Sequence, residues 1–185
     1  MKMTDTLLVL ATTMLAQPLA HAAGAHEHGV ASLNVARSGS ELLIELDSPL
    51  DNFVGFEHAP GNAEQKRRLA DALAVLRDPA RVVSLPDAAA CRLVEAEVDD
   101  PFAPHDDHHH EEADGHEDGE RGHADLEASW HFECANAAAL IGFDVELFKH
   151  FPRLGKLRAQ LVGDAGQSAW VLQPTSVRLE FAVRP

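Results

Sequence analysis

Alternating hydrophobic and polar positions predict that most of this chain folds into β-strands. Leu42, Ile44 and Leu46 alternate with acidic residues, which is the pattern of a strand that buries one face. A second apolar run, at 30–36, is separated from this strand by Arg-Ser-Gly-Ser, and these turn residues predict a β-hairpin over 30–47. Similar patterns predict strands at about 91–98, 126–134, 141–148, 156–162, 168–173 and 177–183, with a helical alternative near Lys149.

One segment has helical periodicity instead. Residues 62–77 place three leucines on one face, begin at Asn62 with Gln65 in the capping-box position, and are followed by Pro79. Strands joined by short turns, with one main amphipathic helix and no β–α–β order, are typical of an antiparallel sheet. The predicted fold class is therefore α+β, as a single domain on an antiparallel β-sheet.

The N-terminus predicts export from the cytoplasm. A basic residue precedes an apolar run at 7–15, and an Ala-His-Ala tripeptide supplies a cleavage pattern with cleavage after Ala22 or Ala23. The alternative is an uncleaved membrane anchor, but the apolar run is shorter than the ~20 residues that span a bilayer. We expect a signal peptide over 1–22 and a mature domain over 23–185 without stable membrane insertion.

Charge excludes one large class of partner and draws attention to one segment. The formal net charge is −15, so binding to nucleic acid or to an anionic membrane surface through clustered Lys and Arg is not expected. The acidity is concentrated at 99–127, where Arg121 is the only Lys or Arg. Almost nothing apolar lies between residues 103 and 126, so we expect a long disordered His/Asp/Glu-rich loop over 99–125.

Histidines within this loop indicate metal binding. Neutral imidazole is the commonest protein ligand for metals, and imidazole with carboxylate suits Zn²⁺ in four-coordinate sites. Cu²⁺ and Ni²⁺ are less favoured alternatives, and all three methionines lie in the predicted signal peptide, leaving no thioether for reduced copper. Zinc uptake should weaken at low pH because zinc must displace protons. The candidate ligands are His105, His108, His109, His110, His116 and His123.

A second set of candidate ligands lies outside the loop. His26 and His28 form an H-x-H pair, which puts both imidazoles on one face of an extended chain. If the N-terminus folds beside the loop after the predicted hairpin, Glu57 and His58 complete a site of three or four ligands. The alternative is a frayed terminus and a hydrogen-bonded loop histidine.

The two cysteines flank the acidic segment. In an oxidising compartment Cys91 and Cys134 can pair across the predicted strands that contain them. A disulfide that closes a loop of about 44 residues stabilises the folded state by about 4 kcal/mol in the chain-entropy model. Two unpaired buried thiols are the alternative.

Several short sequence blocks are distributed along the mature chain. They are HEHGV at 26–30, SPLDN at 48–52, GFEHAP at 55–60, CRL at 91–93, FEC at 132–134, LF at 147–148 and FP at 151–152. Together these blocks resemble a bacterial periplasmic family that includes the zinc-regulated zinc-uptake protein. The resemblance covers essentially the whole mature chain, and its most specific block is Gly-Phe-Glu-His. It implies a periplasmic location, zinc as the ligand, and a supporting role for an ATP-driven zinc importer.

The combined prediction is a zinc-binding protein that captures Zn²⁺ with its His-rich loop and assists uptake by an ABC-type importer. The alternative is a periplasmic buffer that sequesters metal without delivering it. No H-E-x-x-H, H-x-x-E-H, G-x-S-x-G or P-loop motif is present, so we expect no enzymatic activity.

Overall fold

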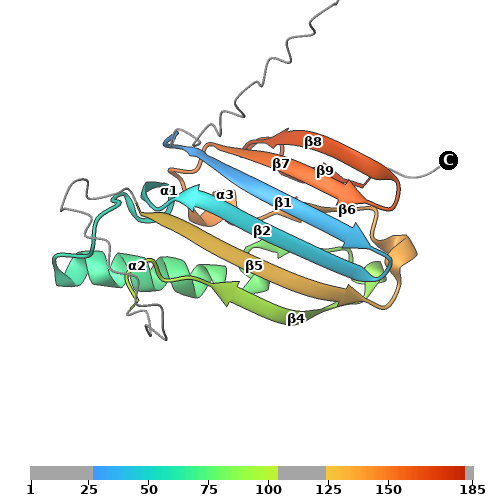
Figure 1. Ribbon diagram of the computed structural model, residues 1–185, viewed down its shortest axis with the longest axis horizontal. Helices are drawn as coiled ribbons and strands as arrows, with labels where there is room; N and C mark the ends of the chain where they lie inside the picture. The colour runs from blue at the N-terminus through green and yellow to red at the C-terminus, as the bar shows by residue number, and fades with distance from the viewer. Residues whose placement is uncertain (1–26, 104–123, 182–185) are drawn as a thin grey trace, which may run out of the picture.

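The computed structural model describes residues 27–103 and 124–181, and these form one α+β domain around a mixed sheet (Figure 1). The large sheet has the strand order β4-β5-β2-β1-β7-β8, and a small second sheet has the order β3-β6-β9. The strands of the large sheet are β1 (Val30–Ser38), β2 (Glu41–Pro49), β4 (Cys91–Val98), β5 (Asp125–Cys134), β7 (Lys156–Gly163) and β8 (Gly166–Leu172). The small sheet contains β3 (Val83–Ser84), β6 (Gly142–Val145) and β9 (Arg178–Glu180).

Among the described residues, helices are few, and all except α2 are short. The α-helices are α1 (Asp51–Val54), α2 (Ala63–Leu76) and α3 (Leu147–His150), and three 3-10 turns occupy Pro79–Arg81, Asp87–Ala89 and Ala137–Ala139. Figure 1 shows α1 and α3 at the end of the large sheet where β1 begins and β2 ends. That end of the sheet holds the candidate site described below.

Local sequence signals identified the hairpin and the main helix correctly. β1 and β2 pair antiparallel in the predicted hairpin, with Val35 opposite Ile44. The helix α2 begins where predicted, because the Asn62 side chain accepts a hydrogen bond of 2.9 Å from the Gln65 backbone N–H. The Gln65 side chain bonds back to the N–H of Gly61, so the start of the helix is fixed from both sides.

The expectation of an antiparallel sheet holds for every neighbouring pair in the large sheet except β1 and β7, which are parallel. A hairpin forces antiparallel pairing, but β7 follows a long connection through β6 and α3 and can approach β1 in either direction. The segment predicted as a strand over 141–148 is a strand only over Gly142–Val145 and then turns into α3. Leu147 is fully buried from that helix, which explains its place in an apolar run.

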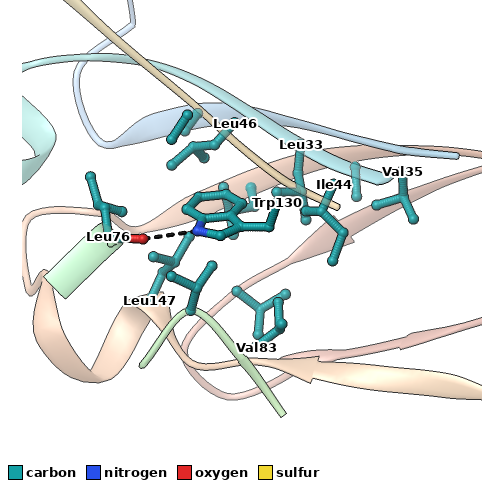
Figure 2. Packing of buried hydrophobic residues seen from close by; sticks show 14 of the residues in the cluster. Leu33, Val35, Ile44, Leu46, Leu76, Val83, Trp130 and Leu147 are labelled. Atoms are coloured by element: carbon teal, nitrogen blue, oxygen red, sulfur yellow. Dashed lines mark hydrogen bonds between the residues drawn. The ribbon is translucent and has the colours of Figure 1, made fainter. Parts of the chain in front are cut away.

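The core lies between the inner face of the large sheet and the layer formed by α2 and the small sheet. Leu33, Ile44 and Trp130 are fully buried from three neighbouring strands (Figure 2). The Trp130 indole N–H donates a 2.8 Å hydrogen bond to the carbonyl of Leu76, the last residue of α2. This bond ties the end of the helix to the centre of the sheet.

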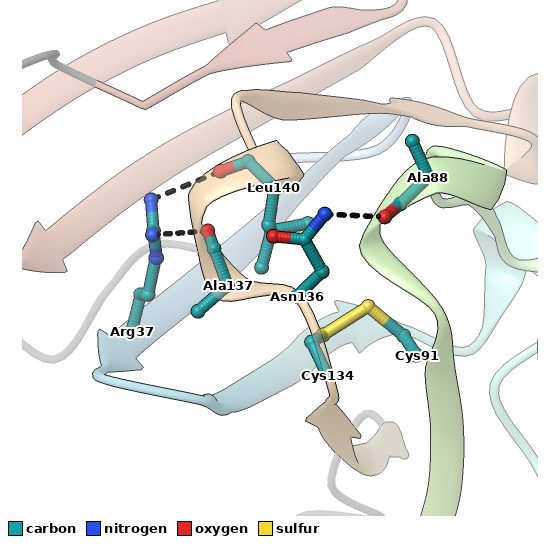
Figure 3. The surroundings of a disulfide bond; sticks show 7 residues. All are labelled: Arg37, Ala88, Cys91, Cys134, Asn136, Ala137 and Leu140. Carbon is teal, nitrogen blue, oxygen red and sulfur yellow. Dashed lines mark hydrogen bonds between the residues drawn. A yellow bond between two sulfur atoms is a disulfide. The ribbon is translucent and has the colours of Figure 1, made fainter.

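The disulfide expected between Cys91 and Cys134 is present, and it closes the end of the β4–β5 ladder (Figure 3). The two residues face each other in the register, as the strand patterns predicted. Beyond the disulfide, the Asn136 amide donates a 3.0 Å bond to the carbonyl of Ala88, and the Arg37 guanidinium donates to the carbonyls of Ala137 and Leu140. The predicted His-rich loop joins the opposite, open end of the ladder.

Candidate metal-binding site

The start of β1 is fixed by the short helix that follows β2. Asn52 in α1 is fully buried, and its side-chain oxygen accepts a 2.6 Å hydrogen bond from the Gly29 N–H. Its amide donates to the carbonyl of Val30 and to the hydroxyl of Ser48, both at 2.9 Å. Gly29 adopts a positive φ of 81°, which favours glycine at this bend. The residue before it, His28, is thereby held over α1.

His28 lies against two carboxylates at this end of the sheet. Its Nε2 is 3.0 Å from Glu57 Oε1, and its Nδ1 is 4.0 Å from Asp51 Oδ2. The carboxylates are largely buried, at 12% exposed for Glu57 and 11% for Asp51, whereas the imidazole is 58% exposed. A buried carboxylate is costly unless it is paired, so this arrangement favours a cation beside it.

Arg153 supplies a fixed cation on the other side of Asp51. Its guanidinium donates three hydrogen bonds to the carboxylate, at 2.7, 2.9 and 3.2 Å, and Nε also donates to the Asp51 backbone carbonyl at 3.0 Å. Bidentate pairs of this kind hold both groups in one geometry. Asp51 is therefore already neutralised by an arginine, and Glu57 is the carboxylate that faces the imidazole most closely.

His58 follows Glu57 but has different partners among the described residues. Its ring stacks on Phe56 with centroids 5.3 Å apart, and its Nδ1 lies 2.9 Å from the carbonyl of Ala59. Because a carbonyl only accepts, Nδ1 carries the proton and donates it, which leaves the lone pair on Nε2 of the neutral ring. Nε2 is one of the two ring nitrogens through which a neutral histidine binds metals.

The last residues of the predicted His-rich loop return to the same place. The Ala124 N–H donates a 3.2 Å bond to the Glu57 carbonyl, and the Ala124 carbonyl accepts a 2.9 Å bond from the Leu50 N–H. Ala124 is therefore attached to the backbone that presents Glu57 and His58.

Several predicted ligands lie outside the described residues: His26, His105, His108, His109, His110, His116 and His123. Within 27–103 and 124–181, no three His, Cys, Asp or Glu side chains are grouped closely enough to hold a metal ion. Of the predicted set, the structure brings together His28 and Glu57. The complete site of three or four ligands stays a prediction.

The solvent face of the large sheet carries acidic residues that sequence reasoning did not group together. Glu45, Asp47 and Glu127 come from β2 and β5, Glu97 comes from β4, and Asp99 follows the end of β4, around a shallow hollow of about 360 Å³. Period-two alternation predicted an outer face for Glu45, Asp47 and Glu127, but it did not predict one for Glu97 or Asp99. Grouping them required the register, in which Asp47 lies opposite Glu127 and Glu45 opposite Ser129.

Comparison with known proteins places the chain in a family. The family of ZrgA zinc uptake proteins matches residues 25–181, which is most of the chain. No curated protein matches it. In the part of the chain that the structure describes, no helix is long and apolar enough to cross a membrane. The match spans the whole domain, including His28, Glu57 and both cysteines, and the chain belongs to the ZrgA family of zinc uptake proteins.

Proposed function

We propose that this protein is exported to the periplasm, where it captures Zn²⁺ through its His-rich segment 105–123 and passes it toward an ABC-type importer. The observation that carries the proposal is the combination of a zinc uptake family with six histidines among carboxylates in one segment. Such a segment offers several interchangeable ligand sets of moderate affinity, because ordering the chain around a metal opposes binding.

His28 and Glu57 are the proposed ligands that the folded domain contributes. One imidazole nitrogen and one carboxylate at 3.0 Å are a suitable pair of donors for zinc, with His58 and His26 as further ligands. The pair is held by Asn52 and by the backbone around Ala124, so less ordering accompanies binding than in the loop. We therefore expect this site to hold one zinc ion more tightly than the segment does.

The acidic residues of the outer sheet face support capture without forming a site. Carboxylates on one side of the domain, together with the acids of 99–127, create a negative field that attracts divalent cations. Added salt screens such a field, so zinc association should be slower at high ionic strength.

A competitive zinc titration tests the proposal on the mature chain with its disulfide intact. Replacing 105–123 with a short Gly-Ser linker should preserve the fold, lower the number of bound zinc ions and leave one tight ion. In that shortened protein, His28→Ala and His58→Ala should each lower the affinity for the one remaining zinc ion. His131→Ala, which changes a histidine paired with Glu41 at the start of β2, at the end of that strand opposite the candidate site, is the matched control and should have no effect.

Two outcomes would contradict parts of this proposal. An unchanged number of bound ions after the replacement would mean that 105–123 does not capture zinc. Loss of every ion would mean that the folded domain holds none, and a sequestering buffer without delivery would then be the better description.

A further inference from the structure

A groove of about 300 Å³ lies beside the candidate site, between α1, α2 and the chain after α3. Its floor is apolar and includes Phe53, Val75 and Phe151, with the two phenyl rings packed edge to face at 4.7 Å. Arg68 and Arg153 stand on its rim and are each more than half exposed. The groove thus combines an apolar floor with accessible guanidinium groups.

The charges around this groove are opposite to those on the outer sheet face. α2 carries three consecutive bases at 66–68, and Lys149 and Arg153 lie at and just beyond α3, whereas the outer sheet face is acidic. Among the described residues lining the groove, Asp71 is the one acid. Glu64 and Glu146 pair with Arg68 and Lys149, so the basic excess is confined to the lining of the groove, on a chain whose formal net charge is −15.

We propose that this groove docks an anionic segment of a partner protein, with one apolar side chain of that segment seated between Phe53, Val75 and Phe151. The apolar floor would bury the partner's apolar side chain. The two arginines would bind carboxylates on either side of it, because guanidinium groups bind carboxylates well. A partner held there lies next to His28 and Glu57, because Arg153 both lines the groove and pairs with Asp51.

The existing ion pairs on the rim leave room for such a partner. Arg68 pairs with Glu64 one turn away on α2, and both side chains are more than half exposed. Exposed pairs of this kind contribute little, so a partner carboxylate can share or replace Glu64 at small cost. Arg153 keeps part of its guanidinium in solvent while it holds Asp51.

The test uses the metal-free mature protein, so its result is separate from that of the zinc proposal. The probe is an acetylated, amidated pentapeptide with a central leucine between pairs of glutamates, titrated into the ¹⁵N-labelled protein and followed by NMR. We expect shifts in the amides of α2 and of 150–153. Arg68→Glu should weaken binding about fivefold, the effect of losing one favourable charge and gaining a like one.

Controls separate docking from general attraction. Arg67→Glu reverses a neighbouring exposed charge outside the groove lining and should leave the affinity within about twofold. A peptide with serine in place of leucine, and one with glutamine in place of glutamate, should each bind more weakly. Absence of binding, equal effects of the two arginine variants, equal binding of the control peptides, or stronger binding to phosphatidylglycerol vesicles than to the peptide would overturn the proposal.

Discussion

Replacing Trp130 with phenylalanine tests whether one indole joins α2 to the sheet. The side chain is fully buried, and its N–H donates to the Leu76 carbonyl at 2.8 Å. The last carbonyls of a helix have no partner within the helix, so the indole satisfies a group that would otherwise be buried without a hydrogen bond. Phenylalanine keeps most of the apolar contact and removes this bond.

The expected cost has two parts. Leaving the Leu76 carbonyl without its partner costs about 1–3 kcal/mol. The smaller ring leaves a void of about 40 Å³, which costs about 1 kcal/mol if the surroundings do not collapse. Together these predict that Trp130→Phe lowers the free energy of unfolding by about 2–4 kcal/mol, and the melting temperature by roughly 5–15 °C for a domain of this size.

Trp170→Phe is the matched control, because that indole is only half-buried on β8 and donates a longer bond of 3.2 Å to the Ser168 hydroxyl. Trp170→Phe should lower the free energy of unfolding by less than about 1 kcal/mol. Both variants are compared by urea unfolding followed by far-ultraviolet circular dichroism, which monitors mainly the backbone and does not rely on tryptophan fluorescence. A loss below about 1 kcal/mol for Trp130→Phe, or equal losses for the two variants, would refute the reasoning.

Three further predictions address the disulfide, the small sheet and the candidate site. Changing Cys91 and Cys134 together to alanine should lower the free energy of unfolding by about 4 kcal/mol, since the bond spans 43 positions, and reductant should then have no further effect on urea unfolding. Gly142→Ala should lower the melting temperature more than Gly61→Ala does. A Cβ added at 142 would clash with a β9 carbonyl, whereas the atom nearest to a Cβ added at 61 would be 3.6 Å away. Equal melting temperatures of the two variants would contradict this reasoning. Glu57→Gln should weaken zinc binding about tenfold while leaving the free energy of unfolding equal or higher, because a neutral amide is cheaper to bury. Calorimetric zinc titration beside urea unfolding checks this, and a less stable variant with unchanged zinc binding would assign Glu57 a structural role.

Features of the fold that depend on local chemistry could be predicted from the sequence. Period-two alternation predicted β2 and β5, and the cap at Asn62 predicted the start of α2. The pairing of Cys91 with Cys134 followed from aligning two strand patterns, of which one begins with a cysteine and the next ends with one. Each of these inferences uses residues whose effect is confined to one element or to two adjacent strands.

Features that depend on how distant segments meet could not be predicted. Nothing local indicates that β7 joins β1 in parallel, since either direction satisfies the same alternation. The pairing of Asp51 with Arg153 likewise links two segments whose own patterns carry no sign of each other. For the site, the sequence named His28 and Glu57 as candidates, but only the fold of α1 against the start of β1 brings these two together.

The position of Ala124 has a consequence for how the two proposed zinc-binding regions work together. Ala124 is hydrogen-bonded to the Glu57 backbone, and the candidate ligands His116 and His123 precede it by eight residues or fewer. A chain of that length spans at most about 28 Å, so any zinc bound by these histidines stays within that distance of Ala124. Transfer to His28 and Glu57 is then an intramolecular step at high effective concentration, and it does not require the metal to return to bulk solvent. The same tether would act in reverse, so the segment would recapture zinc that leaves the folded site, and net delivery would require a partner that removes zinc from both, through tighter binding or through continual import.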